Sequence, residues 1–280
     1  MCSCGIHLFR RFRRQLTEKR KIIMEKKVLL VLFDGLRPEG VEGCSNPFLR
    51  ELKKKSTYTM TGSSVFPSIT LPCHMSIFHS MIPDSHGVKS NRYIKPTVPV
   101  VSLWDLLAQN GKKNFFFYNW EELRDVATPG SMARLTCISH DLYWEKSDLE
   151  LAELTIDALK GEQPDFMFWY VGHTDETAHK YGWLTPEYFE SIDLATSCLE
   201  RMFEVLPENY SVILTADHGG HGTHHGSDLP DDMVIPMFFY GPDFEAGKEV
   251  TDIGLIDIAP TVATLLGCEI PEVWEGKSLV

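Results

Sequence analysis

Continuous runs of apolar residues, each ended by polar residues, most constrain what this chain can fold into. The clearest are residues 27–33 (KVLLVLF), 165–171 (DFMFWYV) and 212–215 (VILT). None of them alternates apolar and polar residues, so each is predicted to be a strand covered on both faces, as in a parallel sheet. Helical patterns separate these strands. The order favours a three-layer α/β/α fold with a mostly parallel central sheet.

The remaining elements follow the same alternation. Further strands are expected at 58–65, 114–118 and 235–240. Helices are expected at 46–55, from just after Thr70 to about 81, and at 101–109, 120–127, 148–160, 186–206 and 257–266. Residues 128–147 are expected to be irregular.

The chain has 280 residues, of which 43% are hydrophobic, which is enough for the core of one domain. Its first 27 residues are strongly basic but contain no apolar run of the kind a secretory signal needs. We therefore assign 1–26 to a basic leader, expected to be disordered, and 27–280 to a single domain. A basic amphipathic helix that touches a membrane is the alternative for the leader. No transmembrane segment is expected, because no run approaches ~20 apolar residues.

Charge and cysteine usage narrow the class further. The net charge of −12 argues against a nucleic-acid-binding surface. It would also repel a phosphate ester unless bound cations invert the local field. The seven cysteines are scattered singly, without a CxxC pair or the spacing of a disulfide framework. This pattern favours a reducing compartment, so we expect a cytoplasmic protein. The sequence indicates no oligomeric state.

Acidic residues follow all three apolar runs. Asp34 comes directly after the first, Asp175 lies four residues beyond the second, and Asp217 with His218 follows the third. A lone aspartate after a strand is usually a turn or helix-capping residue. Three of them, two with histidines attached, indicate a ligand site at the edge where open α/β sheets bind ligands.

Histidines near these aspartates favour a metal site. If the segment is helical, His179 shares a helix face with Asp175, so that the two can hold one cation. His225, in the glycine-rich segment after Asp217, is placed to complete this site. Carboxylates and imidazoles suit zinc or manganese. Spacing cannot choose between these two metals. We expect two divalent ions, because two ions ~4 Å apart clamp the attacking and leaving oxygens of an in-line displacement.

Thr70 is the candidate nucleophile. It precedes a helical segment with Pro72 in its first turn, and the N-terminal end of a helix favours negative charge on an alkoxide or a phosphoryl group. The alternative is an ordinary helix-capping threonine. The three aspartates make us favour the nucleophile.

The segment 66–74 (FPSITLPCH), followed by 83–87 (PDSHG), resembles the nucleophile region of the nucleotide pyrophosphatase/phosphodiesterase family. That family belongs to the alkaline phosphatase superfamily. The spacing from Thr70 to Asn91 and the segment 257–261 (DIAPT) add to the resemblance, which covers nearly all of residues 27–280. It implies a short, single-domain member with an alkaline-phosphatase-like catalytic domain.

The resemblance implies a role for each matching residue. One ion is held by Asp175, His179 and His225, and the other by Asp34, Asp217, His218 and the Thr70 oxygen. Thr70 attacks phosphorus to give a phospho-threonine, which a metal-activated water hydrolyses. Asn91 donates a hydrogen bond to a non-bridging oxygen, a role whose removal typically costs about 10²–10³-fold in rate. Cys73 stands where the family often has asparagine, and we do not count it as catalytic.

We therefore expect a two-metal phosphodiesterase or nucleotide pyrophosphatase that acts on a small-molecule phosphate ester or a nucleotide. A phosphomonoesterase is the near alternative, with Lys89 or Arg92 stabilising the second terminal oxygen. A non-catalytic metal-binding protein on the same fold is the alternative from another class. A sulfatase is less favoured, because TLPCH lacks the Cys/Ser-x-Pro-x-Arg pattern of that branch.

Several residues keep two interpretations. His221 and His224 either line the substrate entrance or cover a polar loop, and the second is preferred. Four aromatic residues are candidates for stacking on a nucleobase: Tyr93, Trp120, Trp169 and Tyr170. Trp169 and Tyr170 lie inside an expected strand and are assigned to the core, which leaves Tyr93 as the better stacking candidate.

Overall fold

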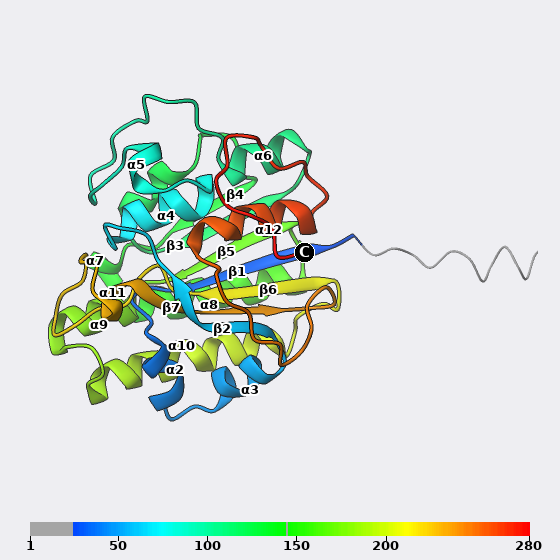
Figure 1. Cartoon of the computed structure of the whole chain (residues 1–280). Helices are drawn as coiled ribbons and strands as arrows, with labels where there is room; N and C mark the ends of the chain where they lie inside the picture. Colours follow the sequence, from blue (N-terminus) through cyan, green and yellow to red (C-terminus); the bar gives the residue numbers. More distant parts are fainter. Residues whose placement is uncertain (1–24, 144) are drawn as a thin grey trace, which may run out of the picture.

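The computed structural model describes residues 25–143 and 145–280 (Figure 1). Most of the predicted leader, residues 1–24, lies outside the described residues, so that assignment stays a prediction. Among the described residues, no helix is long and apolar enough to cross a membrane.

Seven strands form one sheet in the described part of the chain. Their order is β2 (Thr57–Ser63), β7 (Val234–Tyr240), β6 (Tyr210–Thr215), β1 (Lys27–Phe33), β5 (Phe166–Val171), β3 (Asn114–Tyr118) and β4 (Arg134–Cys137). The strands from β6 to β4 pair in parallel. Only β7 runs against its neighbours, β6 and β2. The predicted mostly parallel sheet is confirmed.

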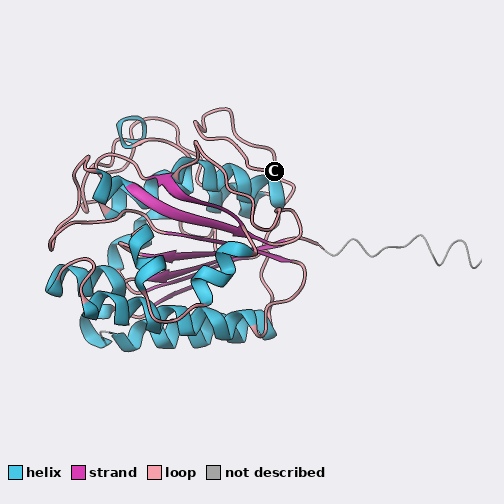
Figure 2. Cartoon of the chain, turned by 60° about the horizontal axis from the view of Figure 1, so that its bottom comes forward, coloured by secondary structure: helices cyan, strands magenta, loops and turns pink. Residues whose placement is uncertain are grey.

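Helices cover both faces of this sheet (Figures 1 and 2). On one side lie α4 (Thr70–His79), α5 (Pro83–His86), α6 (Leu103–Gln109) and α12 (Ile258–Leu265). On the other lie α2 (Pro38–Gly43), α3 (Phe48–Lys54), α8 (Glu145–Lys160) and α10 (Pro186–Phe203). The fold is thus the expected three-layer α/β/α arrangement.

Shorter elements gather where the parallel strands end. These are α7 (His140–Tyr143), α9 (His173–Tyr181) and α11 (Pro230–Met233). Two 3₁₀ helices, η1 (Glu121–Val126) and η2 (Leu255–Asp257), complete the set. The prediction that 128–147 is irregular is wrong in part, because this segment contains β4, α7 and the start of α8. The RLTC sequence of β4 is too short and too polar to be recognised locally; its pairing with β3 forms the strand.

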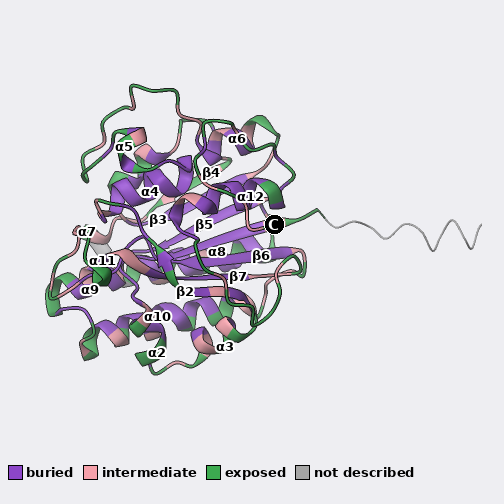
Figure 3. Ribbon diagram, in the orientation of Figure 1, coloured by how far each residue is buried: buried purple, intermediate pink, exposed green. Residues whose placement is uncertain are grey.

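The core lies between the layers, and the sheet is buried on both faces (Figure 3). All six residues of β5 and all six of β6 are buried, as the continuous apolar runs predict. On the α4 side, the ring of Trp104 stacks on Phe116 with centroids 5.1 Å apart, and Phe78 packs on Trp104 at 4.9 Å. This aromatic packing gives the strand ends a rigid base.

Candidate metal centre

The three acidic strand ends meet because their strands are neighbours. β1 lies between β5 and β6, with Phe33 opposite Val171 and Leu32 opposite Thr215. The backbone continues this pairing beyond the strands: the N–H of Asp34 donates to the carbonyl of Val171 at 3.0 Å. Side chains separated by more than a hundred residues in sequence are therefore placed at one edge of the sheet.

The first group of potential metal ligands is Asp175, His179 and His225, whose ligand atoms lie within 4.8 Å of one another. Asp175 and His179 lie one turn apart on α9, with Asp175 Oδ2 and His179 Nε2 3.2 Å apart. His225 approaches from the loop after β6, and its Nε2 lies 4.0 Å from Asp175 Oδ1. The segment after β5 is helical, as the shared face of Asp175 and His179 required.

The second group is Asp34, Asp217 and His218, also within 4.8 Å. His218 Nε2 lies 3.2 Å from Asp34 Oδ1 and 3.4 Å from Asp217 Oδ2. All three side chains are almost completely buried. The two groups adjoin, because the rings of His218 and His225 stack with centroids 3.7 Å apart.

The histidines present the nitrogen that a metal needs. The Nδ1–H of His179 donates to the Thr223 carbonyl at 2.9 Å, that of His218 to Gly219 at 2.8 Å, and that of His225 to Ser68 at 2.8 Å. A carbonyl oxygen can only accept, so Nδ1 carries the proton in the neutral form of each ring, and Nε2 is the nitrogen that can present a lone pair. Metal-ligating histidines in proteins show this same arrangement.

Three carboxylate oxygens also suit the binding of metal ions. Asp34 Oδ1, Asp175 Oδ1 and Asp217 Oδ2 are buried and accept no hydrogen bond. A buried carboxylate oxygen without a partner is costly, since the group has lost its hydration. All three belong to the two groups, and each faces an imidazole Nε2. The residues present therefore fit two divalent cations, with oxygen and nitrogen donors and no thiolate.

The pKa values show the same shortage of positive charge. Burial, followed by the charge of Asp175, raises the pKa of Asp217 to about 8, and burial raises the pKa of Asp34 well above its usual value. Burial lowers the pKa of His218 to about 3. The hydrogen bond with Asp175 raises the pKa of His179 to about 9. Bound cations would hold these carboxylates ionised and the histidines neutral.

Thr70 lies at the start of α4, where it is the first helical residue and Ile69 is the N-cap. The helix begins one residue earlier than its sequence suggested, and Thr70 is not its capping residue. Its Oγ1 is 3.3 Å from His218 Nε2. Asn91 is tied to the same helix end, because its Oδ1 accepts the Leu71 N–H at 3.0 Å and its amide NH₂ remains available to donate.

The loop that carries His218 and His225 is held by close packing and by a buried carboxylate. A Cβ on Gly219 would lie 2.1 Å from the carbonyl oxygen of Asp231, and one on Gly220 would lie 2.3 Å from the ring of Trp183. Asp232, which is fully buried, accepts hydrogen bonds from the Ser227 N–H and hydroxyl at 2.8 and 2.7 Å. Only glycines allow the loop to lie this close to its neighbours.

The two spare histidines have structural contacts. His221 Nδ1 lies 2.7 Å from Asp232 Oδ1, and the backbones of His221 and His224 bond to each other. Neither belongs to the metal-ligand groups found among the described residues. Cys73 is fully buried, with its Sγ 3.5 Å from the Ser64 hydroxyl.

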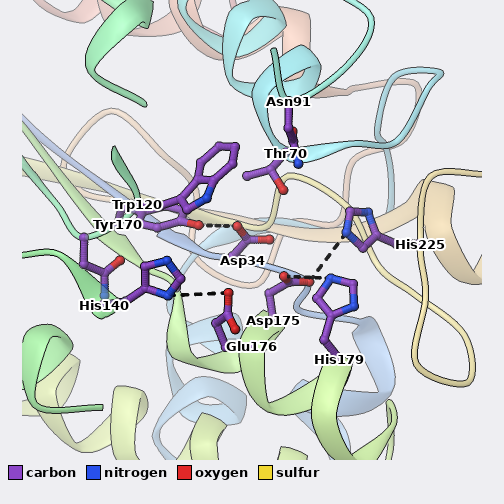
Figure 4. Close-up of a pocket in the computed structure, with 12 residues that line it drawn as sticks. Asp34, Thr70, Asn91, Trp120, His140, Tyr170, Asp175, Glu176, His179 and His225 are labelled. Atoms are coloured by element: carbon purple, nitrogen blue, oxygen red, sulfur yellow. Dashed lines mark hydrogen bonds and ion pairs between the residues drawn. The ribbon is translucent and has the colours of Figure 1, made fainter. Parts of the chain in front are cut away.

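A cavity of about 110 Å³ opens over the two groups (Figure 4). Its lining contains the predicted Asp34, Thr70, Asn91, Asp175, His179 and His225, together with Asn119, Trp120, His140, Tyr170, Gly172 and Glu176. The sequence did not single out Asn119, His140 or Glu176. Tyr170 was assigned to the core, yet its hydroxyl donates to Asp34 Oδ2. Tyr93, the preferred stacking candidate, lies in a separate groove beside His79.

Polar residues at or near the ends of strands carried the missed signal. Tyr170 is in the apolar run 166–171, where a phenol must find a partner. Asn119 directly follows β3 at the same sheet edge as Asp34. Both positions could have been found by the reasoning that identified the aspartates, namely that polar residues at the end of an apolar strand lie at the edge of the sheet.

The protein has an α/β/α fold, with two carboxylate–imidazole groups beside a threonine at the start of a helix. These features define a protein of the alkaline-phosphatase-like class. The model of the family "Type I phosphodiesterase / nucleotide pyrophosphatase" matches residues 28–234. The chain belongs to this family.

Curated relatives are distant and longer. Ectonucleotide pyrophosphatase/phosphodiesterase family member 1 of Homo sapiens is 27% identical over 216 residues, which are 68% of this chain and 23% of that protein. Family member 7 of Homo sapiens is 23% identical over 70% of this chain and 48% of its own length. The chain thus spans about a quarter to a half of these relatives.

Solved structures share the fold. Murine ectonucleotide pyrophosphatase/phosphodiesterase 5, an inactive form in complex with AMP, has a TM-score of 0.75 at 15% identity and covers 88% of this chain and 96% of its own. A 2-O GAG sulfatase has a TM-score of 0.74 at 17% identity, covering 91% and 73%. At these identities the likeness concerns the fold alone.

Proposed function

We propose that the protein is a two-metal phosphodiesterase or nucleotide pyrophosphatase with Thr70 as its nucleophile. The observation that carries this proposal is the position of the Thr70 hydroxyl. It lies 3.3 Å from His218 Nε2, at the start of α4, beside two groups of buried metal-ligand atoms. A hydroxyl in this position can lose its proton and attack phosphorus.

In this proposal the residues are metal ligands, and Thr70 is in addition the nucleophile. Asp175, His179 and His225 hold one divalent ion, and Asp34, Asp217 and His218 hold the other, together with the Thr70 oxygen. When bound, the ions supply Lewis acidity for the attacking and leaving oxygens. The Thr70 oxygen forms a bond to phosphorus and displaces one ester group as its alcohol, and water then cleaves the phospho-threonine and restores the hydroxyl. Zinc is favoured, with manganese as the second choice.

Asn91 serves the developing charge on phosphorus. Its Oδ1 is engaged by the Leu71 N–H, which fixes the amide plane and leaves the NH₂ toward the Thr70 side of the cavity (Figure 4). A donor held in this way can bind a non-bridging oxygen without reorganisation.

The charge of the cavity lining favours a diester over a monoester. Among the described residues that line the cavity there is no lysine or arginine, while Glu176 adds an acidic group. Lys89, one of the two cations expected near the site, pairs with Asp84 at 2.5 Å, and Arg92 is not part of the lining. A monoester dianion would meet more repulsion and no such cation, so the phosphomonoesterase becomes the weaker alternative.

A nucleotide or another small phosphodiester is the proposed substrate, in line with the relatives' names and with AMP in the murine neighbour. The cytoplasmic location remains a prediction from the cysteine pattern.

The proposal is tested by three substrates and two variants. The purified protein is assayed for bound metal and for hydrolysis of bis(4-nitrophenyl) phosphate, 4-nitrophenyl phosphate and a dinucleotide. We expect zinc-dependent cleavage of the diesters, and loss of at least ~10³-fold in Thr70→Ala, because the covalent route is removed. The matched control is Thr155→Ala, a buried threonine on α8 whose hydroxyl donates to the Leu151 carbonyl one turn earlier in the same helix.

Equal activity in Thr70→Ala and wild type would refute the nucleophile. Bound metal without hydrolysis of any ester would instead support the non-catalytic reading of the fold.

A further inference from the structure

The side chain of Trp183 contacts segments that carry both groups of candidate metal ligands, although it belongs to neither group. Trp183 lies two residues after the end of α9 and is 7% exposed. Its backbone N–H donates to the Gly222 carbonyl at 2.9 Å, in the loop between His218 and His225. A buried indole needs a partner for its own N–H. That partner is a backbone carbonyl next to a metal ligand.

The indole N–H acts on the second group, Asp34, Asp217 and His218, through Gly35. It donates to the Gly35 carbonyl at 2.9 Å. The N–H of Gly35 donates to Asp217 Oδ1 at 3.3 Å, while Asp217 Oδ2 faces His218 Nε2 at 3.4 Å. Gly35 directly follows Asp34 in the chain. Because the indole holds Gly35, it fixes the backbone beside Asp34 and the donor that orients the Asp217 carboxylate.

Close packing keeps Gly35 in this place. Its φ is +68°, in the left-handed region that favours glycine. A Cβ there would lie 3.1 Å from Asp175 Oδ1 and 3.2 Å from Cζ2 of Trp183. The backbone at Gly35 therefore lies between a ligand of the first group and the indole.

The ring of Trp183 packs against both histidines of the first group. Its centroid lies 5.5 Å from that of His179, with the planes at 80°, and 6.0 Å from that of His225, with the planes at 63°. Both are edge-to-face contacts. In Figure 4 the two imidazoles approach Asp175 from different segments. The side chain of His179 is 38% exposed, so few other neighbours limit its rotation. The indole supports both imidazoles in the orientation that an ion needs.

We propose that Trp183 is a positioning residue for both metal sites, with its N–H serving the second group and its ring serving the first. The inference rests on the two-metal site of the proposed function and deepens it. The indole nitrogen only donates, so Trp183 is not itself a metal ligand. It acts through Gly35 on one side and through the two imidazoles on the other.

The two contributions can be separated, because phenylalanine keeps an aromatic ring and lacks the N–H. Loss of a hydrogen bond behind a metal ligand typically costs about 10–100-fold in affinity. The Tyr188 hydroxyl also donates to the Gly35 carbonyl, at 2.8 Å, and remains in the variant. Trp183→Phe is therefore expected to weaken zinc binding at the second group about tenfold and at the first group less than about threefold. Trp183→Leu also removes the ring and should weaken both sites about tenfold or more.

Each site is measured alone, so that the two ions are not confused. His218→Ala disables the second group and leaves the first, whereas His179→Ala disables the first and leaves the second. In each background, competition with a chelator of known affinity gives the zinc affinity with tryptophan, phenylalanine or leucine at position 183. The readout is binding and does not depend on turnover. A merely structural role would lower stability without distinguishing the two sites.

Trp274→Phe is the matched control. Trp274 is also 7% exposed, and its indole N–H donates to the Val101 carbonyl at 2.7 Å. This substitution removes the same kind of hydrogen bond from a segment that carries no candidate metal ligand. It should keep both zinc affinities. Thermal unfolding without metal verifies that each variant folds, and the Trp183→Phe result decides alone if Trp183→Leu does not fold.

Unchanged zinc affinity of Trp183→Phe in both backgrounds would overturn the inference. So would an equal loss at the two sites in Trp183→Phe, or the same loss in Trp274→Phe, because the indole N–H would then have no specific task. Hydrolysis of bis(4-nitrophenyl) phosphate by the wild type separates the two proposals. Turnover with unchanged affinities in the Trp183 variants refutes the positioning role alone. The expected affinities without turnover refute the catalytic function alone.

Discussion

Removal of the Tyr170 hydroxyl is expected to weaken one metal site and spare the other. The phenol is buried, and its O–H donates to Asp34 Oδ2, while Asp34 Oδ1 faces His218. Burial raises the pKa of Tyr170 well above its usual value, so the phenol stays protonated and remains a donor. In Tyr170→Phe the carboxylate loses this donor and part of its orientation.

The magnitude follows from the nature of the bond. A hydrogen bond to a charged group is worth about 1.5–3 kcal/mol, and loss of an outer partner of a metal ligand typically costs about 10–100-fold in affinity. We expect the ion at Asp34 to bind about 10–100-fold more weakly. The ion at Asp175 should change little, because Tyr170 does not contact that group's histidines in any described interaction.

The affinity of the protein for each of the two ions is measured separately, by competition with a chelator of known affinity. Tyr210→Phe is the matched control: Tyr210 is 1% exposed and its hydroxyl donates to the Pro164 carbonyl at 2.6 Å, next to the opposite end of β6. It should lose about 1 kcal/mol of unfolding free energy and keep both metal affinities. Unchanged affinity at both sites in Tyr170→Phe, or an equal loss in the control, would refute the reasoning.

Three further predictions concern the same edge of the sheet. In metal-free protein the folded-state pKa values of Asp34 and Asp217 are raised, the latter to about 8, so the protonated forms are favoured on folding. Burial lowers the pKa of His218, His74, His79 and His86, and this opposes the trend below about pH 7. The free energy of unfolding should therefore fall as the pH rises from about 7 to about 8, and zinc should cancel this fall; denaturant titrations at several pH values check it, and a flat metal-free profile in this range would contradict it. Asp148→Asn is expected to lower the free energy of unfolding by about 1–3 kcal/mol, because one amide oxygen cannot replace a carboxylate that accepts from the Gly172, His173 and Asn119 donors. Urea unfolding measures this loss, and a variant as stable as the wild type would contradict it. Asp232→Ala should lower the affinity of the ion at His225 about tenfold by freeing its loop, as measured by the same competition, and an affinity within twofold of wild type would contradict it.

The positions of the aspartates could be predicted because the signal is local. A continuous apolar run forms a buried strand wherever it lies in the chain, and the first polar residues after it must reach the sheet edge. Asp34, Asp175 and Asp217 each follow such a run, so their common location needs only the expectation that the strands are parallel. The pairing of Asp175 with His179 is equally local, since it depends on one helical turn.

Three other residues that line the cavity could not be predicted in this way. Asn119, His140 and Glu176 are brought together by the insertion of β3 next to β5 and by Asp148, which binds both Asn119 and the start of α9. β4 and α7, which lead the chain to His140, have sequences too short to show a period.

The sequence by itself determined the parallel strands, the acidic strand ends and the ligand types, because each depends on the periodicity or chemistry of a few neighbouring residues. Only the tertiary structure decided which imidazole nitrogen faces the cavity, since the carbonyls that fix Nδ1 of His179 and His225 belong to distant segments. It also decided that Tyr170 serves Asp34 and that Glu176 faces His140. Contacts of this kind depend on how separate elements pack, and packing is a property of the whole chain.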